Sequence, residues 1–176
     1  AFTDSWLIKK FEEQEDIDFH KGLIEKWLPA SFKFRERQFK EPVKSSAFSS
    51  VVSLSKLYDA VTNADKNSLN KEKLGETYAS VLEKVFLFCV VWSVGAGVDE
   101  ASRRKFNSCL SDIDAIFPPT NTLYDYFVDY TKNEFVGWDT KVPTFRSTKE
   151  TPFFDMIVPT IDTVRNTYIV QTLQAA

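Results

Sequence analysis

The side chains that could carry catalysis or bind a metal ion are few in this chain and widely separated. His20 is the only histidine, and Asp16, Asp18 and Glu25 lie near it in the sequence, so these residues form the one set that could be drawn as metal ligands. A Ser–His–Asp or Cys–His centre would also have to use His20. The simpler interpretation is a partly exposed histidine on a helix. We therefore expect no catalytic residue and no metal site, and we expect the substitution His20→Ala to be silent.

Motifs that bind phosphate or calcium are missing from the sequence. A phosphate-binding loop needs several glycines followed by a lysine and a hydroxyl residue, and the 5 glycines of the chain form no such string. The acidic run Glu12–Asp18 lacks the alternating oxygen ligands and the glycine turn of a calcium loop. That run is typical of a solvated helix end.

Arg103 and Arg104 are cationic residues placed where they could act on a neighbouring ligand. They follow Asp99, which is expected to cap the start of a helix. They could bring positive charge to a phosphate bound by an adjacent part of a larger protein. Alternatively, they are surface arginines paired with Asp99 or Glu100.

Composition and charge limit the classes of partner. The 176 residues carry a net charge of -3, which gives no excess positive field for nucleic acid. The longest apolar run, Val85–Trp92, is far shorter than the ~20 residues that cross a bilayer, so we expect no membrane span. Cys89 and Cys109 have no metal-ligand spacing and are expected to be buried thiols of a reducing compartment. The start at Ala1 suggests a piece cut from a longer chain.

The pattern of apolar residues predicts a mostly helical first half. Spacings of three and four residues run from Thr3 to Phe39, with one helix expected to end before Pro29 and another to begin with Ser31 as its cap. Ser45 or Ser46 is expected to cap the next helix.

The longest helix is expected to run from about Asn70 to Val94. Its apolar stretch Val85–Trp92 has no polar face, so the helix should be central. Gly95 and Gly97 would close it in the left-handed conformation, and Asp99 would cap the next helix.

The last third of the sequence has a different composition from the helical first part. Leu123–Tyr130 and Phe135–Trp138 are rich in aromatic and β-branched residues and predict a β-hairpin around the turn Thr131–Glu134. Its aromatic side chains are expected to pack on the helical body. An extended connector, Asp139–Thr151, would lead to a final helix that begins at Pro159-Thr160. The predicted fold class is mainly α, with a small antiparallel hairpin and a C-terminal helix.

Several short segments occur in the order found in dynein heavy chains, which this chain resembles. The segments are Trp92–Gly95 (WSVG), Arg103–Phe106 (RRKF), Phe117-Pro118, Tyr124–Tyr126 (YDY), Trp138, Pro152–Phe154 (PFF) and Val158–Arg165 (VPTIDTVR). Dynein heavy chains contain six AAA+ modules, each with an α/β large subdomain followed by a helical lid.

The resemblance implies the lid of the second module running into the start of the third. Residues 1–118 would be the helical lid-like subdomain, 119–151 the hairpin and connector, and 152–176 the first segment of the following module. Ile157, Val158, Pro159 and Thr160 would border the adenine pocket of that module, with ATP or ADP bound only in the longer parent protein.

The resemblance also implies a function. The chain would be a noncatalytic fragment that couples neighbouring ATP-binding modules in a minus-end-directed microtubule motor. Its partners would be those modules and, through the parent, microtubules and dynein intermediate and light chains. The localisation would be the cytoplasm and cytoskeleton, in a cilium or flagellum axoneme, because the segments Trp92–Ala96 and Asp99–Phe106 are similar to axonemal inner-arm heavy chains. The alternative is a free-standing helical module that binds a partner helix in an aromatic groove.

Overall fold

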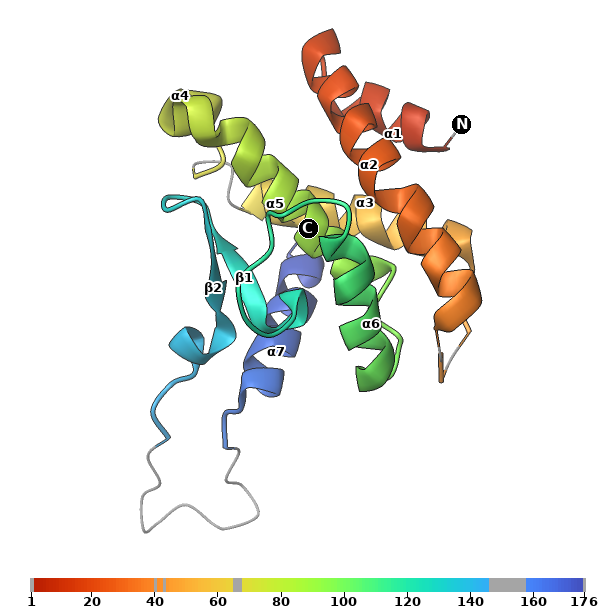
Figure 1. The fold of residues 1–176 in the computed structure, drawn as a ribbon. Helices are drawn as coiled ribbons and strands as arrows, with labels where there is room; N and C mark the ends of the chain where they lie inside the picture. The colour runs from red at the N-terminus through yellow and green to blue at the C-terminus, as the bar shows by residue number, and fades with distance from the viewer. Residues whose placement is uncertain (1, 40, 43, 65–67, 146–157, 176) are drawn as a thin grey trace.

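The protein is a mainly helical body with one two-stranded antiparallel hairpin and a C-terminal helix, as the sequence predicts (Figure 1). The computed structural model describes residues 2–39, 41–42, 44–64, 68–145 and 158–175. The helices are α1 (Phe2–Lys10), α2 (Gln14–Gln38), α3 (Ala47–Ala64), α4 (Lys71–Leu74), α5 (Tyr78–Ser93), α6 (Glu100–Ser111) and α7 (Ile161–Gln174). The strands are β1 (Tyr126–Asp129) and β2 (Glu134–Gly137), and short 3₁₀ turns are η1 (Gly75–Thr77), η2 (Leu123–Asp125) and η3 (Trp138–Lys141).

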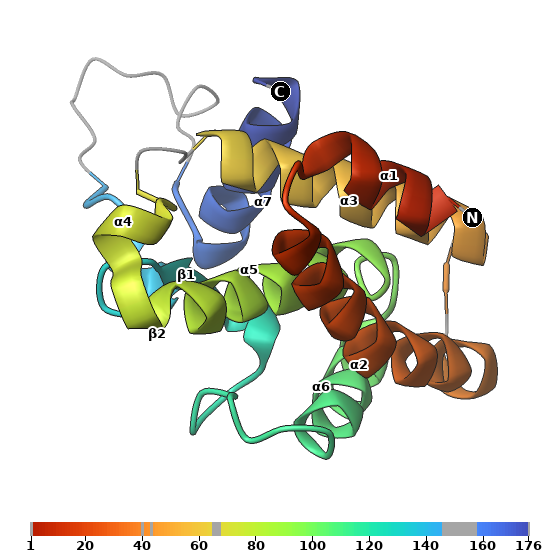
Figure 2. The ribbon, with the colours of Figure 1, turned by 90° about the horizontal axis from the view of Figure 1, so that it is seen from above.

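Helix α5 is the centre of the fold. Every residue from Val85 to Val91 is buried, because this stretch has no polar side and must be covered all round. Figure 2 shows α5 crossed by α2 on one side and running beside α3, and β1 also packs on it. Burial of each such side chain contributes about 1.5–3 kcal/mol relative to exposure, so α5 organises the core.

The single long helix expected over Asn70–Val94 is interrupted. Asn70 caps a short α4, the 3₁₀ turn η1 follows, and α5 begins only at Tyr78. Gly75 has φ of 51°, a left-handed conformation that glycine adopts without strain and that a helix cannot contain. The longest helix is instead α2, with 25 residues.

The predicted break at Pro29 is wrong, since α2 continues through it. Pro29 lies on the exposed side of the helix, so the carbonyl that loses its amide partner, that of Glu25, is on the solvent side. Ser31 does not cap a new helix. Its hydroxyl donates to the Trp27 carbonyl at 2.6 Å, one turn back in the same helix.

Polar contacts fasten the outer helices to α3. Ser46 caps α3 by accepting from the Ser49 amide at 3.0 Å, which confirms one of the two predicted caps. The buried Arg35 of α2 reaches the start of α3 through Ser50 Oγ at 2.7 Å and pairs with Glu41 Oε1 at 2.9 Å. A buried guanidinium is stable only when its donors are satisfied in this way.

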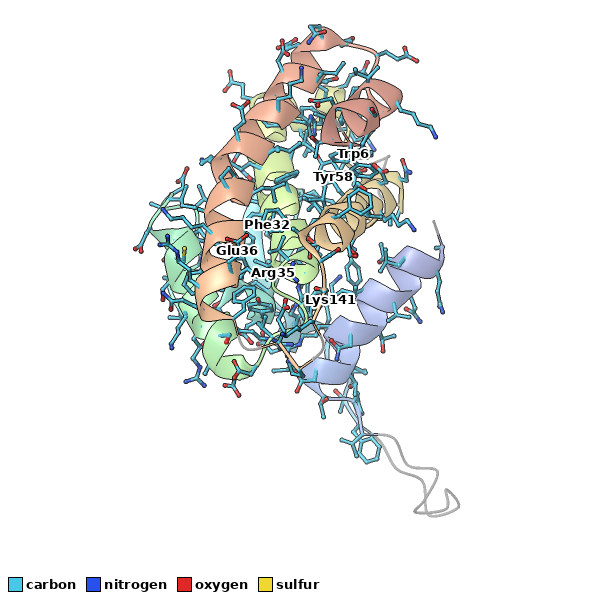
Figure 3. The ribbon with its side chains drawn as sticks, turned by 90° about the vertical axis from the view of Figure 1, so that its right-hand side faces the viewer. Trp6, Phe32, Arg35, Glu36, Tyr58 and Lys141 are labelled. Atoms are coloured by element: carbon cyan, nitrogen blue, oxygen red, sulfur yellow. The ribbon has the colours of Figure 1, made fainter. Side chains whose placement is uncertain are left out.

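At the other end of α3, α1 is held by one carboxylate. Asp59 accepts from Trp6 Nε1 at 3.0 Å and from Lys10 Nζ at 2.5 Å. Figure 3 shows Trp6 of α1 beside Tyr58 of α3, and their ring centroids are 6.0 Å apart.

The hairpin lies on the side of α5 away from α1, and the last helix packs on α3 and on η3 (Figure 1). Tyr126 pairs with Gly137 and Asp129 with Glu134. Asn133 has φ of 55° in the tight turn between the strands. β1 lies inside the predicted segment Leu123–Tyr130, whereas β2 begins at Glu134, one residue earlier than predicted, because Glu134 pairs with Asp129. Helix α7 begins where it was expected.

None of the helices in the described ranges is both long and apolar enough to cross a bilayer.

His20 is fully buried, so its predicted partial exposure is wrong. Its ring lies between Phe11, at 4.2 Å between centroids, and Tyr58, at 5.5 Å. Nδ1 donates to the Asp16 carbonyl at 2.6 Å, because a carbonyl only accepts, and Nε2 accepts from the Tyr58 hydroxyl at 2.7 Å. The imidazole is a neutral core residue whose two nitrogens are both used.

This environment predicts a stability change with pH. Burial lowers the pKa of His20 below its ordinary value of 6.5, so below that pH the unfolded chain takes up a proton more readily than the folded chain. The His20 contribution to the free energy of unfolding is therefore complete above pH 6.5 and falls as the pH drops through that value.

The test compares the free energy of unfolding by urea at about pH 7.5 and about pH 5.5. Wild type should lose more stability across this interval than His20→Gln, which cannot titrate. His20→Ala should also destabilise the fold at both pH values, contrary to the silent substitution expected from sequence, because it leaves a cavity and an unpaired Tyr58 hydroxyl. Equal pH dependence in wild type and His20→Gln would contradict a neutral buried imidazole.

Candidate functional site

A broad groove lies between α6, η2 and the start of α7. Its volume is about 1000 Å³. Charged and polar side chains from all three elements line it: Glu100, Arg103, Arg104, Asn107, Thr122, Asp125, Asp162 and Arg165 are among them. We call this hollow the arginine groove.

Arg103 lies at the inner wall of the arginine groove. Asp99 caps α6 by accepting from the Ser102 amide at 2.8 Å, as predicted, which fixes Arg103 in the first turn. The Arg103 guanidinium lies 4.9 Å from the ring centroid of Tyr124 and 5.9 Å from that of Trp92. The charge is therefore held against aromatic faces rather than by a carboxylate.

Arg165 comes from α7 and reaches the same indole ring. Its side chain is 12% exposed, and its guanidinium lies 5.6 Å from the Trp92 centroid. Nη1 donates to the Tyr124 carbonyl at 3.2 Å and lies 3.6 Å from Asp125 Oδ1, while Nη2 pairs with Asp162. Arg165 therefore joins α7 to η2 and to the end of α5.

Three buried nitrogen donors beside the groove lack a hydrogen-bond partner among the described residues. They are Nε of Arg103, Nε of Arg165 and Nε1 of Trp92. Buried donors normally have partners. Each of these nitrogens is itself shielded from solvent, so an acceptor from outside would reach it only if the surrounding side chains moved.

Arg104 is a surface arginine paired with an acidic residue, which is the alternative interpretation from the sequence. Its side chain is 72% exposed, and it pairs with Glu100 one turn earlier. Arg104 thus contributes to the outer rim of the groove, whereas Arg103 is directed into the protein. An exposed pair of this kind contributes little to stability.

The segment before α7 has one clear role in the structure. Thr160 caps α7: its hydroxyl accepts from the Thr163 amide at 3.2 Å, and Thr163 Oγ1 accepts from the Thr160 amide at 2.7 Å. Val158 is 54% exposed and Pro159 borders a shallow hollow beside Trp138. Ile157 lies outside the described residues.

Sequence reasoning did not single out Arg165, although it stands in the quoted segment Val158–Arg165. A local signal existed, because Arg165 follows the first-turn Asp162 by three residues on the predicted helix. Its pairing with Tyr124 spans 41 positions in the sequence and could not be deduced from spacing.

The remaining side chains that could react or bind a metal ion are the cysteines and the candidate metal ligands. In the ranges that the structure describes, no group of three or more His, Cys, Asp or Glu residues could hold a metal ion. Burial raises the pKa of the Cys89 thiol and, less strongly, that of Cys109. Both thiols therefore resist ionisation and are poor nucleophiles.

The comparisons with known proteins agree with one another. Residues 20–140 match the family described as "Dynein heavy chain AAA lid domain". The chain is 34% identical over 175 residues to human dynein axonemal heavy chain 2, which covers 99% of this chain and 4% of that protein. It is 27% identical to the dynein-1-beta heavy chain of the flagellar inner arm I1 complex of Chlamydomonas reinhardtii, over 96% of this chain and 4% of the relative. Identity to mouse dynein axonemal heavy chain 1 is 30%, over 98% of this chain and 5% of the relative.

The packing around the arginine groove predicts that alanine destabilises the protein at Gly95 but has little effect at Gly97. Gly95 and Gly97 do not have the left-handed conformation expected from sequence. Gly95 is required for space instead, because a Cβ there would lie 2.2 Å from Tyr124 Oη and 2.8 Å from the Phe106 ring, and Tyr124 Oη donates to the Gly95 carbonyl.

Gly95→Ala should therefore lower the free energy of unfolding by about 1–3 kcal/mol, the usual cost of overpacking. Gly97→Ala is the matched control, since a Cβ at Gly97 meets nothing within 4 Å, and it should change stability by less than about 1 kcal/mol. Chemical unfolding measures both. Equal effects of the two substitutions would contradict the packing of Tyr124 and Phe106 described here.

Proposed function

Because this chain belongs to the dynein heavy chain AAA lid domain family, we propose that it transmits nucleotide-dependent movement between two neighbouring modules of a motor ring. The chain spans about 4% of the length of relatives such as human dynein axonemal heavy chain 2. The motor activity itself would thus reside in the longer protein. In the proposed arrangement, residues 1–118 form the lid, 119–151 the hairpin and connector, and 152–176 the start of the following module.

The observation that carries this proposal is the position of Arg165 between two parts of the chain. Arg165 belongs to α7, the proposed first helix of the following module, and it contacts Trp92 at the end of α5 and the backbone of Tyr124. Arg103 of α6 contacts the rings of the same two residues, Trp92 and Tyr124. A rotation of α6 would therefore disturb the contacts that position α7.

The lid would move as one body because its core is closely packed. Trp27, Phe86 and Phe106 are fully buried on α2, α5 and α6, respectively. Packed cores shift between discrete arrangements and do not deform continuously. In contrast, α7 has no buried residue, and it is attached to α3 and η3 through partly exposed side chains.

The arginine groove fits an anionic group brought by a neighbour. Arg103, Arg104 and Arg165 line the groove, and the exposed Arg104 at its rim would exchange its Glu100 partner for a phosphate or carboxylate. ATP in the longer protein would supply the hydrolysable phosphate, and ADP would remain after hydrolysis. This chain's residues would orient it, and we propose that the chain has no catalytic activity by itself.

We also propose that Ile157, Val158, Pro159 and Thr160 border the adenine pocket of the following module. The exposure of Val158 and the capped start of α7 at Thr160 support this role. Backbone amide and carbonyl groups beside an adenine ring can recognise its edge without a special side chain.

The relatives suggest where such a motor works. Their names place them in axonemes and in the flagellar inner arm, so we propose a cilium or flagellum and, through the longer protein, microtubules and intermediate and light chains as partners. The alternative of a free-standing interaction module is favoured only if the gene encodes this segment alone. A reading frame that continues into a glycine-rich phosphate-binding loop would remove it.

The coupling role is tested by Arg165→Ala in the heavy chain that contains this sequence. Loss of the contacts to Trp92 and Tyr124 should reduce the microtubule-stimulated ATPase rate by roughly 2- to 30-fold, which corresponds to a coupling free energy of about 0.5–2 kcal/mol. Lys105→Ala, at an exposed position on α6, is the control and should leave the rate unchanged. The proposal fails if Arg165→Ala and Lys105→Ala both match wild type while the motor stays folded.

A further inference from the structure

We infer that Phe127, Trp138 and Tyr168 form an aromatic cage for an ammonium group, and that the chain's own Lys141 occupies it as a latch that holds α7 on the hairpin. None of these four residues is among those that line the arginine groove. The inference deepens the proposed coupling, on which its functional consequence rests, but the latch itself is a property of this chain.

The cage is built from three separate elements. Phe127 comes from β1, Trp138 from η3 and Tyr168 from α7. Lys141 Nζ lies 4.1 Å from the Phe127 centroid, 5.4 Å from that of Tyr168 and 5.9 Å from that of Trp138. All three distances lie within the range in which a ring attracts a cation. One ammonium group therefore bridges the strand, the turn and the last helix.

The rings also contact each other, which fixes the shape of the cage. The Trp138 centroid lies 5.0 Å from that of Phe127 and 5.2 Å from that of Tyr168, with tilted planes in both pairs. Trp138 is fully buried, and Phe88 of α5 lies behind it at 6.5 Å. The cage is thus anchored on the central helix and does not depend on Lys141 alone for its position.

The short turn η3 explains why Lys141 reaches these rings. In a 3₁₀ helix, side chains three residues apart lie above one another, which places Lys141 over Trp138. The turn is closed by the Val142 amide donating to the Asp139 carbonyl at 3.2 Å and by Thr140 Oγ1 donating to the Gly137 carbonyl at 2.7 Å. The backbone therefore presents the lysine in one direction.

The aromatic faces are the interaction that holds the Lys141 ammonium. Within the described ranges, Lys141 makes no ion pair and no side-chain hydrogen bond, whereas Lys10 and Lys26 are both paired with carboxylates. A lysine that lies over three rings without a carboxylate partner is typical of an ammonium-binding cage. Figure 3 shows Lys141 beside α7.

The latch matters because α7, which packs on α3 and on η3, is attached through partly buried side chains only. None of its residues is buried, and Val164, Tyr168 and Ile169 are the ones that are packed, in part, against the core. Arg165 fastens the first turns of α7, and Tyr168, one turn further on, is the residue that Lys141 contacts. Removal of the ammonium charge should therefore loosen α7 while the rest of the body stays intact.

The test measures hydrogen exchange of the α7 amides in the 176-residue chain. Lys141→Met keeps a flexible apolar side chain but removes the charge, and it should speed exchange of α7 by roughly 2- to 30-fold, the range that corresponds to loss of cation–π contacts. Lys141→Arg keeps the charge and should stay near wild type. Lys132→Met, at an exposed lysine in the hairpin turn, is the control and should have no effect.

A second experiment tests whether a cation added to the solution can occupy the cage. Lys141→Ala leaves the three rings without their cation, and tetramethylammonium chloride should slow α7 exchange back toward wild type, whereas sodium chloride at the same concentration should not. The inference is overturned if Lys141→Met exchanges like wild type, or if tetramethylammonium and sodium act alike on Lys141→Ala. Neither result depends on motor activity, so failure of the latch and failure of the coupling proposed for Arg165 are separable.

Discussion

The fold depends on the need to cover a helix that has no polar side. From Val85 to Val91, α5 presents apolar side chains in every direction, and each direction is occupied by another element. α2 and α3 cover two sides, and β1 and η2 cover another. Because a close-packed core resists gradual deformation, these elements form one body. The attachments of α1 and α7 are secondary to it.

Cations set against aromatic rings recur where separate parts of this body meet. Arg103 and Arg165 contact Trp92, and Lys141 contacts three rings at the hairpin. Such contacts are weaker than core packing and can form and break without unfolding the protein. They suit the junction between a rigid lid and a helix that belongs, in the proposed arrangement, to the next module.

Local signals in the sequence were sufficient for much of the fold. The apolar run placed α5 at the centre, and Asp99 and Thr160 were recognised as caps because capping depends on residues only two or three positions apart. Packing between residues far apart in the sequence could not be deduced from these local signals. His20 is buried by Phe11 and Tyr58, and Gly95 is needed because Tyr124 and Phe106 approach its backbone. For the same reason, the pairing of Arg165 with Tyr124 emerged only in three dimensions.

Native-state hydrogen exchange at increasing urea concentration tests the division between body and attached helix most directly. The amides of α5 should exchange only through global unfolding, with the same free energy and the same urea dependence as unfolding itself. The amides of α7 should exchange through a local opening of lower free energy and weaker urea dependence. If α5 and α7 exchange with one common free energy, the last helix is part of the rigid body and cannot act as a separately movable element.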